Sequence, residues 1–72
     1  MTQEKKIALL EDMLDVDEGT LTPATVLADL DEWDSLARLS LIVMMSDECD
    51  KQVTGADVRA YVTVQDILTA MD

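Results

Sequence analysis

The segment formed by residues 35–49 is apolar on nearly every side when it is drawn as a helix. Leu36, Leu39 and Val43 recur at i, i+3 and i+7 on one side. A second apolar stripe on another side consists of Leu41, Ile42, Met45 and Cys49. A chain of 72 residues has little other surface with which to bury both stripes, so we expect one of them to be exposed for a partner. The alternative is a central helix that the rest of the chain surrounds, and periodicity does not distinguish the two.

Apolar spacing and capping residues predict three further helices around this segment. Residues 2–14 carry apolar side chains at i, i+3 and i+7. Two shorter helices follow later in the chain, each opening with a capping box, Thr54 with Asp57 and Thr63 with Asp66. Their inward-facing side chains are expected to be Val58, Tyr61, Val64, Ile67, Leu68 and Met71. The predicted fold is all-α, a four-helix bundle with one short helix, in a single domain of residues 1–72.

The connection between the first two helices, residues 19–34, is long for so small a domain, and such loops are often functional. Thr22 and Pro23 have the order of a helix cap and a first-turn proline. The side chains expected to pin this connection to the core are Leu21, Val26, Leu27 and Leu30.

The charge of the chain is strongly acidic, with sixteen acidic residues, five basic residues and a net charge of −11. This balance argues against binding to nucleic acid or to an anionic membrane, both of which need basic patches. It favours basic protein partners, although an acidic surface that only maintains solubility is an equal alternative. No stretch resembles a signal peptide or a membrane span, so a cytoplasmic location is expected. A monomer is the expected working form.

Few residues offer the chemistry of an enzyme or a metal site. The chain has no histidine, and its one cysteine, Cys49, is expected to be a buried structural thiol. Acidic clusters start at Asp15 and Asp29, but the twelfth positions of calcium loops begun there are Val26 and Ser40 instead of glutamate. Nothing predicts a cleft or a desolvated acid. We therefore predict no catalytic residue and no metal site.

Asp34, Ser35 and Leu36 open the long apolar helix, which would expose the serine at its first turn. Unpaired N–H groups and the helix dipole favour a phosphate at such a position. With the segment of residues 24–30 before this tripeptide and the Thr63-Val64 pair after it, the chain resembles the acyl and peptidyl carrier proteins over essentially its whole length.

The resemblance implies that Ser35 accepts a 4'-phosphopantetheine arm from coenzyme A through a separate, magnesium-dependent phosphopantetheinyl transferase. Asp34 would cap the helix and Leu36 would belong to the docking face. The arm's thiol would hold an acyl or aminoacyl group as a thioester and present it to loading and processing enzymes, because tethering raises the effective concentration of the cargo. The carrier itself would catalyse nothing.

The resemblance also assigns the two apolar stripes, with the second one directed into the bundle. The partner-binding residues that it implies are Leu36, Leu39, Ser40, Val43, Asp47 and Val53. Partner enzymes would dock on them through basic patches. The side chain of Trp33, next to the motif, either packs over the end of the bundle or contacts partner or cargo.

Several residues depart from the carriers of primary fatty acid synthesis. Glu32 and Trp33 replace a small pair before the motif, Ser40 and Ser46 replace helix glutamates, and Arg38 adds a positive charge. These changes favour a dedicated carrier in a specialised pathway. The alternatives are a carrier of primary type II fatty acid synthesis, an aminoacyl or D-alanyl carrier, and an acidic helical adaptor without a prosthetic group. The sequence leaves the cargo and the docking enzymes open.

Overall fold

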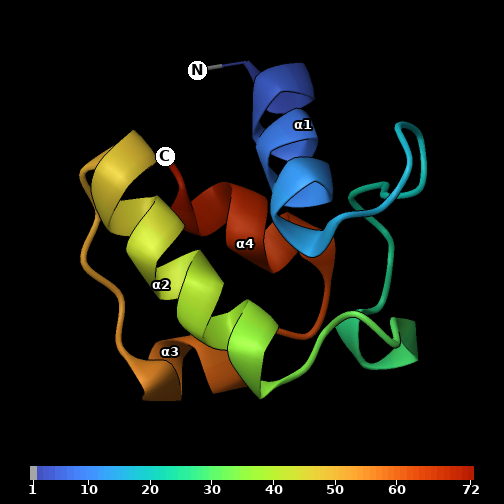
Figure 1. Cartoon of the computed structure of the whole chain (residues 1–72). Coiled ribbons are helices and arrows are strands. Elements are labelled where there is room, and N and C mark those ends of the chain that lie inside the picture. Colours follow the sequence, from blue (N-terminus) through green and yellow to red (C-terminus); the bar gives the residue numbers. More distant parts are fainter. Residues whose placement is uncertain (1) are drawn as a thin grey trace.

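The structure is a computed structural model that describes residues 2–72. It contains the helices α1 (Gln3–Leu14), α2 (Ser35–Cys49), α3 (Gly55–Ala60) and α4 (Val64–Ala70), and the short 3-10 helix η1 (Leu27–Asp29). α2 packs against α1 on one side and α3 on the other, and α4 packs against α1 (Figure 1). The predicted all-α fold with four helices is confirmed. α3 and α4 are both short, with six and seven residues.

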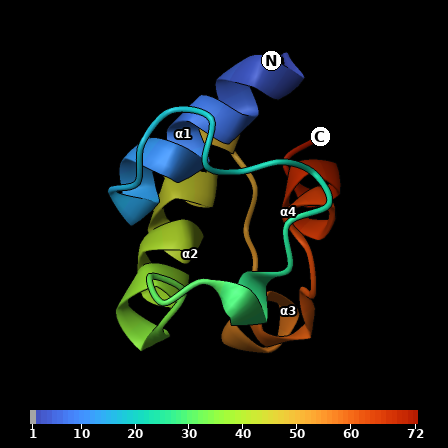
Figure 2. The same cartoon turned by 90° about the vertical axis from the view of Figure 1, so that its right-hand side faces the viewer.

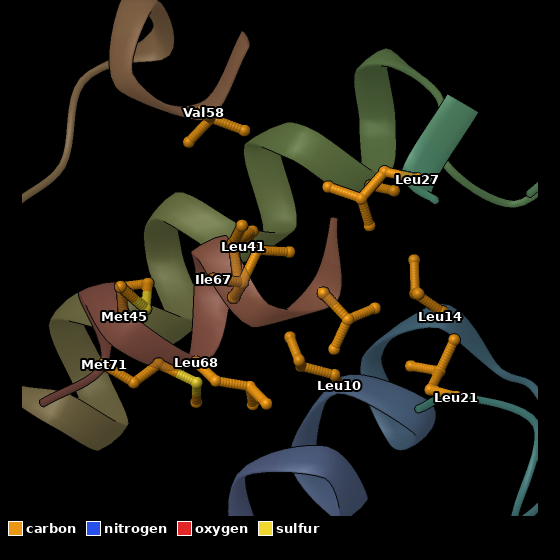
Figure 3. Close-up of a cluster of buried hydrophobic side chains, with 12 residues drawn as sticks. Leu10, Leu14, Leu21, Leu27, Leu41, Met45, Val58, Ile67, Leu68 and Met71 are labelled. Carbon is orange, nitrogen blue, oxygen red and sulfur yellow. The ribbon is translucent and has the colours of Figure 1, made fainter. Parts of the chain in front are cut away.

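One cluster of buried aliphatic and methionine side chains joins all four helices and the long loop. Figure 3 shows side chains from α1, the loop, α2 and α4 pointing toward a common interior, with Val58 of α3 at its edge. Tyr61 lies only half-buried beside it. The buried members are Leu10, Leu14, Leu21, Leu27, Ala37, Leu41, Met45, Val58, Val64, Ile67, Leu68 and Met71. Every helix thus contributes to one core.

The two apolar stripes of α2 have different surroundings. Leu41 and Met45 are fully buried, whereas Leu36, Leu39 and Val43 are exposed to 71%, 58% and 54%. The alternative in which the other helices surround α2 is therefore wrong. The second stripe is covered incompletely, because Ile42 and Cys49 are half-buried at the rim of the core. The expectation of a buried thiol at Cys49 is corrected accordingly: it is half-buried and packs against the core.

The long loop is tied to the start of α4 by backbone hydrogen bonds. Figure 2 shows this loop leaving α1, passing α4 and reaching η1 close to α3. The N–H of Val64 donates to the carbonyl of Thr25, and the N–H of Gln65 donates to the carbonyl of Pro23, both at 3.0 Å. The first N–H groups of a helix have no partner within the helix. The loop therefore supplies the acceptors that α4 needs.

One expectation for the side chains of the loop is wrong. Thr22 and Pro23 lie in a turn of the loop, in which the N–H of Thr22 donates to Oγ1 of Thr25 at 2.9 Å. Val26 forms an isolated antiparallel bridge with Thr63, and its side chain is 38% exposed instead of pinned to the core. Among the other residues expected to pin the loop, Leu21 and Leu27 are buried and Leu30 is half-buried.

A buried carboxylate holds the beginning of the loop against α1. Oε2 of Glu11 accepts hydrogen bonds from the N–H of Gly19 at 2.9 Å and from the N–H of Leu21 at 3.1 Å. Glu11 is almost fully buried, and Gly19 has a φ of +88°, in the left-handed region where glycine is preferred. The side chain of Glu11 thus accepts the hydrogen bonds that water would otherwise accept from these N–H groups, and the side chain of Leu21 can be buried in the core.

Lys6 makes a second buried polar contact on α1. Its Nζ donates to the carbonyl of Leu68 at 3.3 Å and forms an ion pair with Asp72. Apolar periodicity predicted neither this contact nor that of Glu11, because both side chains reach residues distant in the sequence.

Glu11→Ala should lower the free energy of unfolding by about 2 kcal/mol, because it removes the charged acceptor of two N–H groups, one of them buried. Urea unfolding monitored by circular dichroism measures the change. Asp12→Ala, at the neighbouring exposed carboxylate, is the matched control and should shift stability by less than about 0.5 kcal/mol. Equal losses in the two variants would contradict the role of Glu11.

Asp66 connects the α3–α4 turn to α4. Its Oδ2 accepts hydrogen bonds from the N–H of Val62 at 2.8 Å and from the N–H of Thr63 at 3.1 Å. These bonds favour the ionised carboxylate and hold the pKa of Asp66 below its ordinary value. Asp66 thereby provides one half of the capping box predicted at Thr63.

The contribution of Asp66 to stability should depend on pH. Because its pKa is lower in the folded than in the unfolded chain, the contribution is present above about pH 4 and is lost as the pH falls through the folded pKa. Urea unfolding of the parent and of Asp66→Asn should therefore differ at neutral pH and converge in acid. Asp31→Asn, which removes an equal charge from the exposed loop, controls for net charge. A difference that persists in acid would contradict this assignment.

Candidate functional site

The side chain of Asp34 fixes the start of α2. Asp34 is the N-cap residue, with extended backbone, and its Oδ1 accepts the N–H of Ala37 at 2.8 Å. This bond satisfies one of the first N–H groups of the helix. The capping role expected of Asp34 is therefore present, and it places Ser35 at the first helical position.

Ser35 is exposed at this first turn. Its Oγ accepts a hydrogen bond from Nη2 of Arg38, one turn further along α2, at 3.2 Å. A guanidinium and the positive end of a helix dipole both favour an anionic group at this place. An exposed hydroxyl in such surroundings is suited to carry a phosphate ester, and a large group can reach it from solvent.

A small hollow lies beside Ser35, between α2 and α3. Its volume is about 200 Å³. The residues that line it are Ser35, Arg38, Leu39, Ile42, Gly55 and Arg59. Reasoning from the sequence did not identify Arg59, because periodicity does not show that the short helix α3 packs beside the first turns of α2.

The side chains expected on the partner face divide between two further hollows and the core. Leu39, Ser40, Val43 and Asp47 line one hollow of about 440 Å³ on α2. Leu36 lines a neighbouring one, together with Ser40 and Asp34. Val53 lines neither of them; it is half-buried in the loop after α2 and packs against the core.

Trp33 is half-buried and packs against the core. Its backbone N–H donates to the carbonyl of Leu30 at 3.1 Å, within the turn that leads into α2. Of the two roles considered for this side chain, these contacts support packing over the end of the bundle.

Residues 2–72 contain neither a metal-binding cluster nor a helix that could cross a membrane. No group of three or more His, Cys, Asp or Glu side chains in this part of the chain is placed to hold a metal ion. None of the helices described in it combines the length and the apolar character needed to cross a membrane.

The family model described as "Phosphopantetheine attachment site" matches residues 7–71, so the chain belongs to this family of phosphopantetheine-carrying proteins. Such domains are sites of covalent 4'-phosphopantetheine attachment, and they are carriers rather than catalysts. Carriers of this family interact with phosphopantetheinyl transferases and biosynthetic enzymes. Comparisons with curated proteins and with solved structures gave no match.

Replacing the cap and replacing the serine should have different effects on folding. Asp34→Ala should lower the free energy of unfolding by about 1 kcal/mol, because the N–H of Ala37 loses its acceptor. Ser35→Ala removes an exposed hydroxyl, and stability should change by less than about 0.5 kcal/mol. Urea unfolding of both variants measures the two effects. A large loss in Ser35→Ala would show that this hydroxyl is needed for the fold.

Proposed function

We propose that the chain carries its phosphopantetheine on Oγ of Ser35 and presents acyl or aminoacyl groups to partner enzymes. The observation that carries this proposal is the position of Ser35, exposed at the first turn of α2 beside its cap and within the segment matched by the family. We further propose that residues 1–72 form one carrier domain that works as a monomer.

The other serines of the chain are less suitable for attachment. Ser40 is half-buried in the second turn of α2, and Ser46, although exposed, lies near the end of the same helix. Neither stands at the positive end of the helix dipole. Only Ser35 among the three serines combines exposure with a helix start.

This chain supplies few of the groups that the loading reaction needs. The hydroxyl oxygen of Ser35 forms a bond to the phosphorus that bears pantetheine in coenzyme A, while the bond from this phosphorus to the adenosine-bearing phosphate breaks. The hydroxyl proton passes to a base of the transferase. Asp34 holds the first turn of α2 in place, and Arg38 offers its charge beside the new ester. When attached, the arm supplies a thiol that binds cargo as a thioester.

The exposed stripe of α2 supports the proposed docking face. Leu36, Leu39 and Val43 are three large apolar side chains on one face of a helix, and such faces commonly mark interaction sites. Ser40 and Asp47 lie beside them, and Val53 follows in the next loop. The overall acidity favours enzymes with basic docking patches.

The cargo that we propose belongs to a specialised biosynthetic pathway in the cytoplasm. Support comes from the departures on and before α2, where Ser40, Ser46 and Arg38 reduce its acidity and Glu32 and Trp33 precede the motif. Enzymes of primary fatty acid synthesis that dock through arginines would find fewer carboxylates on this helix.

Intact-protein mass spectrometry tests the attachment. The parent, Ser35→Ala and Ser46→Ala are each incubated with coenzyme A, magnesium and a broad-specificity phosphopantetheinyl transferase. The parent and the matched control Ser46→Ala should gain one phosphopantetheine, and Ser35→Ala should gain none.

Two outcomes would contradict the proposal. Loading of Ser35→Ala to the level of the parent would place the arm elsewhere. A folded parent that neither this transferase nor a cognate one can load would favour the acidic adaptor without a prosthetic group.

A further inference from the structure

Both arginines of this acidic chain line the hollow next to Ser35. Arg38 reaches it from α2 and Arg59 reaches it from α3. The chain has only five basic residues. They are Lys5, Lys6, Arg38, Lys51 and Arg59. Two of the five therefore gather at one hollow of about 200 Å³, on different helices.

Among residues 2–72, no carboxylate forms an ion pair with either arginine. Within residues 2–72, the one ion pair with an N–O distance of 4.0 Å or less joins Lys6 and Asp72. The guanidinium groups of Arg38 and Arg59 thus remain without an acidic partner, although the chain has sixteen acidic residues. Two like charges at one hollow repel each other, and an anion placed there relieves this repulsion.

The side chains already point toward the attachment oxygen and the hollow. Arg38 is half-buried, and its Nη2 donates to Oγ of Ser35 at 3.2 Å. Nη1 of Arg59 lies beside Gly55, where an added Cβ would be 3.6 Å from it, and Gly55 lines the same hollow. Arg59 therefore lies back along α3 toward its first residue.

Building on the proposed attachment at Ser35, we propose that Arg38 and Arg59 form an anion-binding site for the phosphodiester of the arm. Oγ of Ser35 would become an ester oxygen of this group, so Arg38 is already within hydrogen-bond distance of the atom bonded to phosphorus. A guanidinium presents several N–H donors in a planar fork that matches phosphate oxygens. The two arginines would hold the base of the arm between α2 and α3.

The structural alternative for Arg59 is a role at the end of its own helix. Arg59 lies in the last turn of α3, where a cation interacts favourably with the helix dipole. That role is independent of the arm. It predicts no change at Arg59 when the arm is attached, which separates it from the anion-binding site.

Nuclear magnetic resonance of the apo and loaded protein tests the site directly. The Nε–H signals of Arg38 and Arg59 should both shift when the arm is attached, whereas the Nζ signals of Lys51, a cation in the loop after α2, should not. Relaxation of the ¹⁵N-labelled amides of the arm then measures its mobility. In Arg38→Gln and in Arg59→Gln, the ratio of arms bound at the site to arms free in solvent should fall roughly two- to fivefold. This is the size of effect that exposed ion pairs have.

Lys51→Gln is the matched control, because it removes one positive charge from the loop between α2 and α3 without touching the hollow. Its arm should be as restricted as that of the parent, and added salt should release the arm in both. Thermal unfolding verifies that each variant is folded. If Arg38→Gln does not fold, the arm mobility in Arg59→Gln and the arginine signals of the apo and loaded parent still test the anion-binding site.

The mass of each sample separates this inference from the proposed function. A parent that never gains the arm overturns both. The anion-binding site alone is overturned if the parent is loaded on Ser35 but neither arginine signal shifts on loading and the arm is as mobile as in the glutamine variants.

Discussion

The packing of Leu41 and Met45 of α2 against the other helices is the contact on which the rest of the fold depends. Both side chains are fully buried, and α1, α3, α4 and the long loop all contribute to the cluster that surrounds them. The chain has no phenylalanine, so this core consists mainly of leucine, valine, isoleucine and methionine. A domain of this size covers only one side of its most apolar helix. The opposite side, with Leu36, Leu39 and Val43, stays in solvent, and the proposed docking face results from this limit.

The backbone of the long loop links this core to the functional end of the molecule. The carbonyls of Pro23 and Thr25 accept the first N–H groups of α4, while Glu11 holds the preceding turn against α1. A loop without such partners would leave polar groups unsatisfied near the core. The same loop continues through η1 and the turn at Trp33 to Asp34. It therefore places Asp34 where its side chain caps α2. The exposure of Ser35 thus depends on contacts far from it in the sequence.

Sequence patterns predicted the parts of this protein that depend on neighbouring residues. The bounds of α2, the caps at Asp34 and Thr54 and the inward side chains of α4 all follow from spacing within one helix. The patterns failed where the partner is remote. Val26, which was expected to pin the loop to the core, is 38% exposed, and its backbone pairs with that of Thr63. In the sequence, Glu11 and Lys6 occupy ordinary polar positions of an amphipathic helix. Their burial depends on partners elsewhere in the chain, which periodicity does not show.

By itself, the sequence determined the helical class, the position of Ser35 at the start of an apolar helix and the existence of two apolar stripes, because local periodicity and capping require only residues a few positions apart. Membership of the phosphopantetheine attachment family was also readable from it, through motifs at fixed spacing. Periodicity left open which stripe is covered, and the tertiary structure decided it in agreement with the family resemblance. Only the tertiary structure showed that Arg59 joins Arg38 at the hollow beside Ser35. Both depend on how α1 and α3 pack against α2, and this packing results from the burial of side chains contributed by every part of the chain.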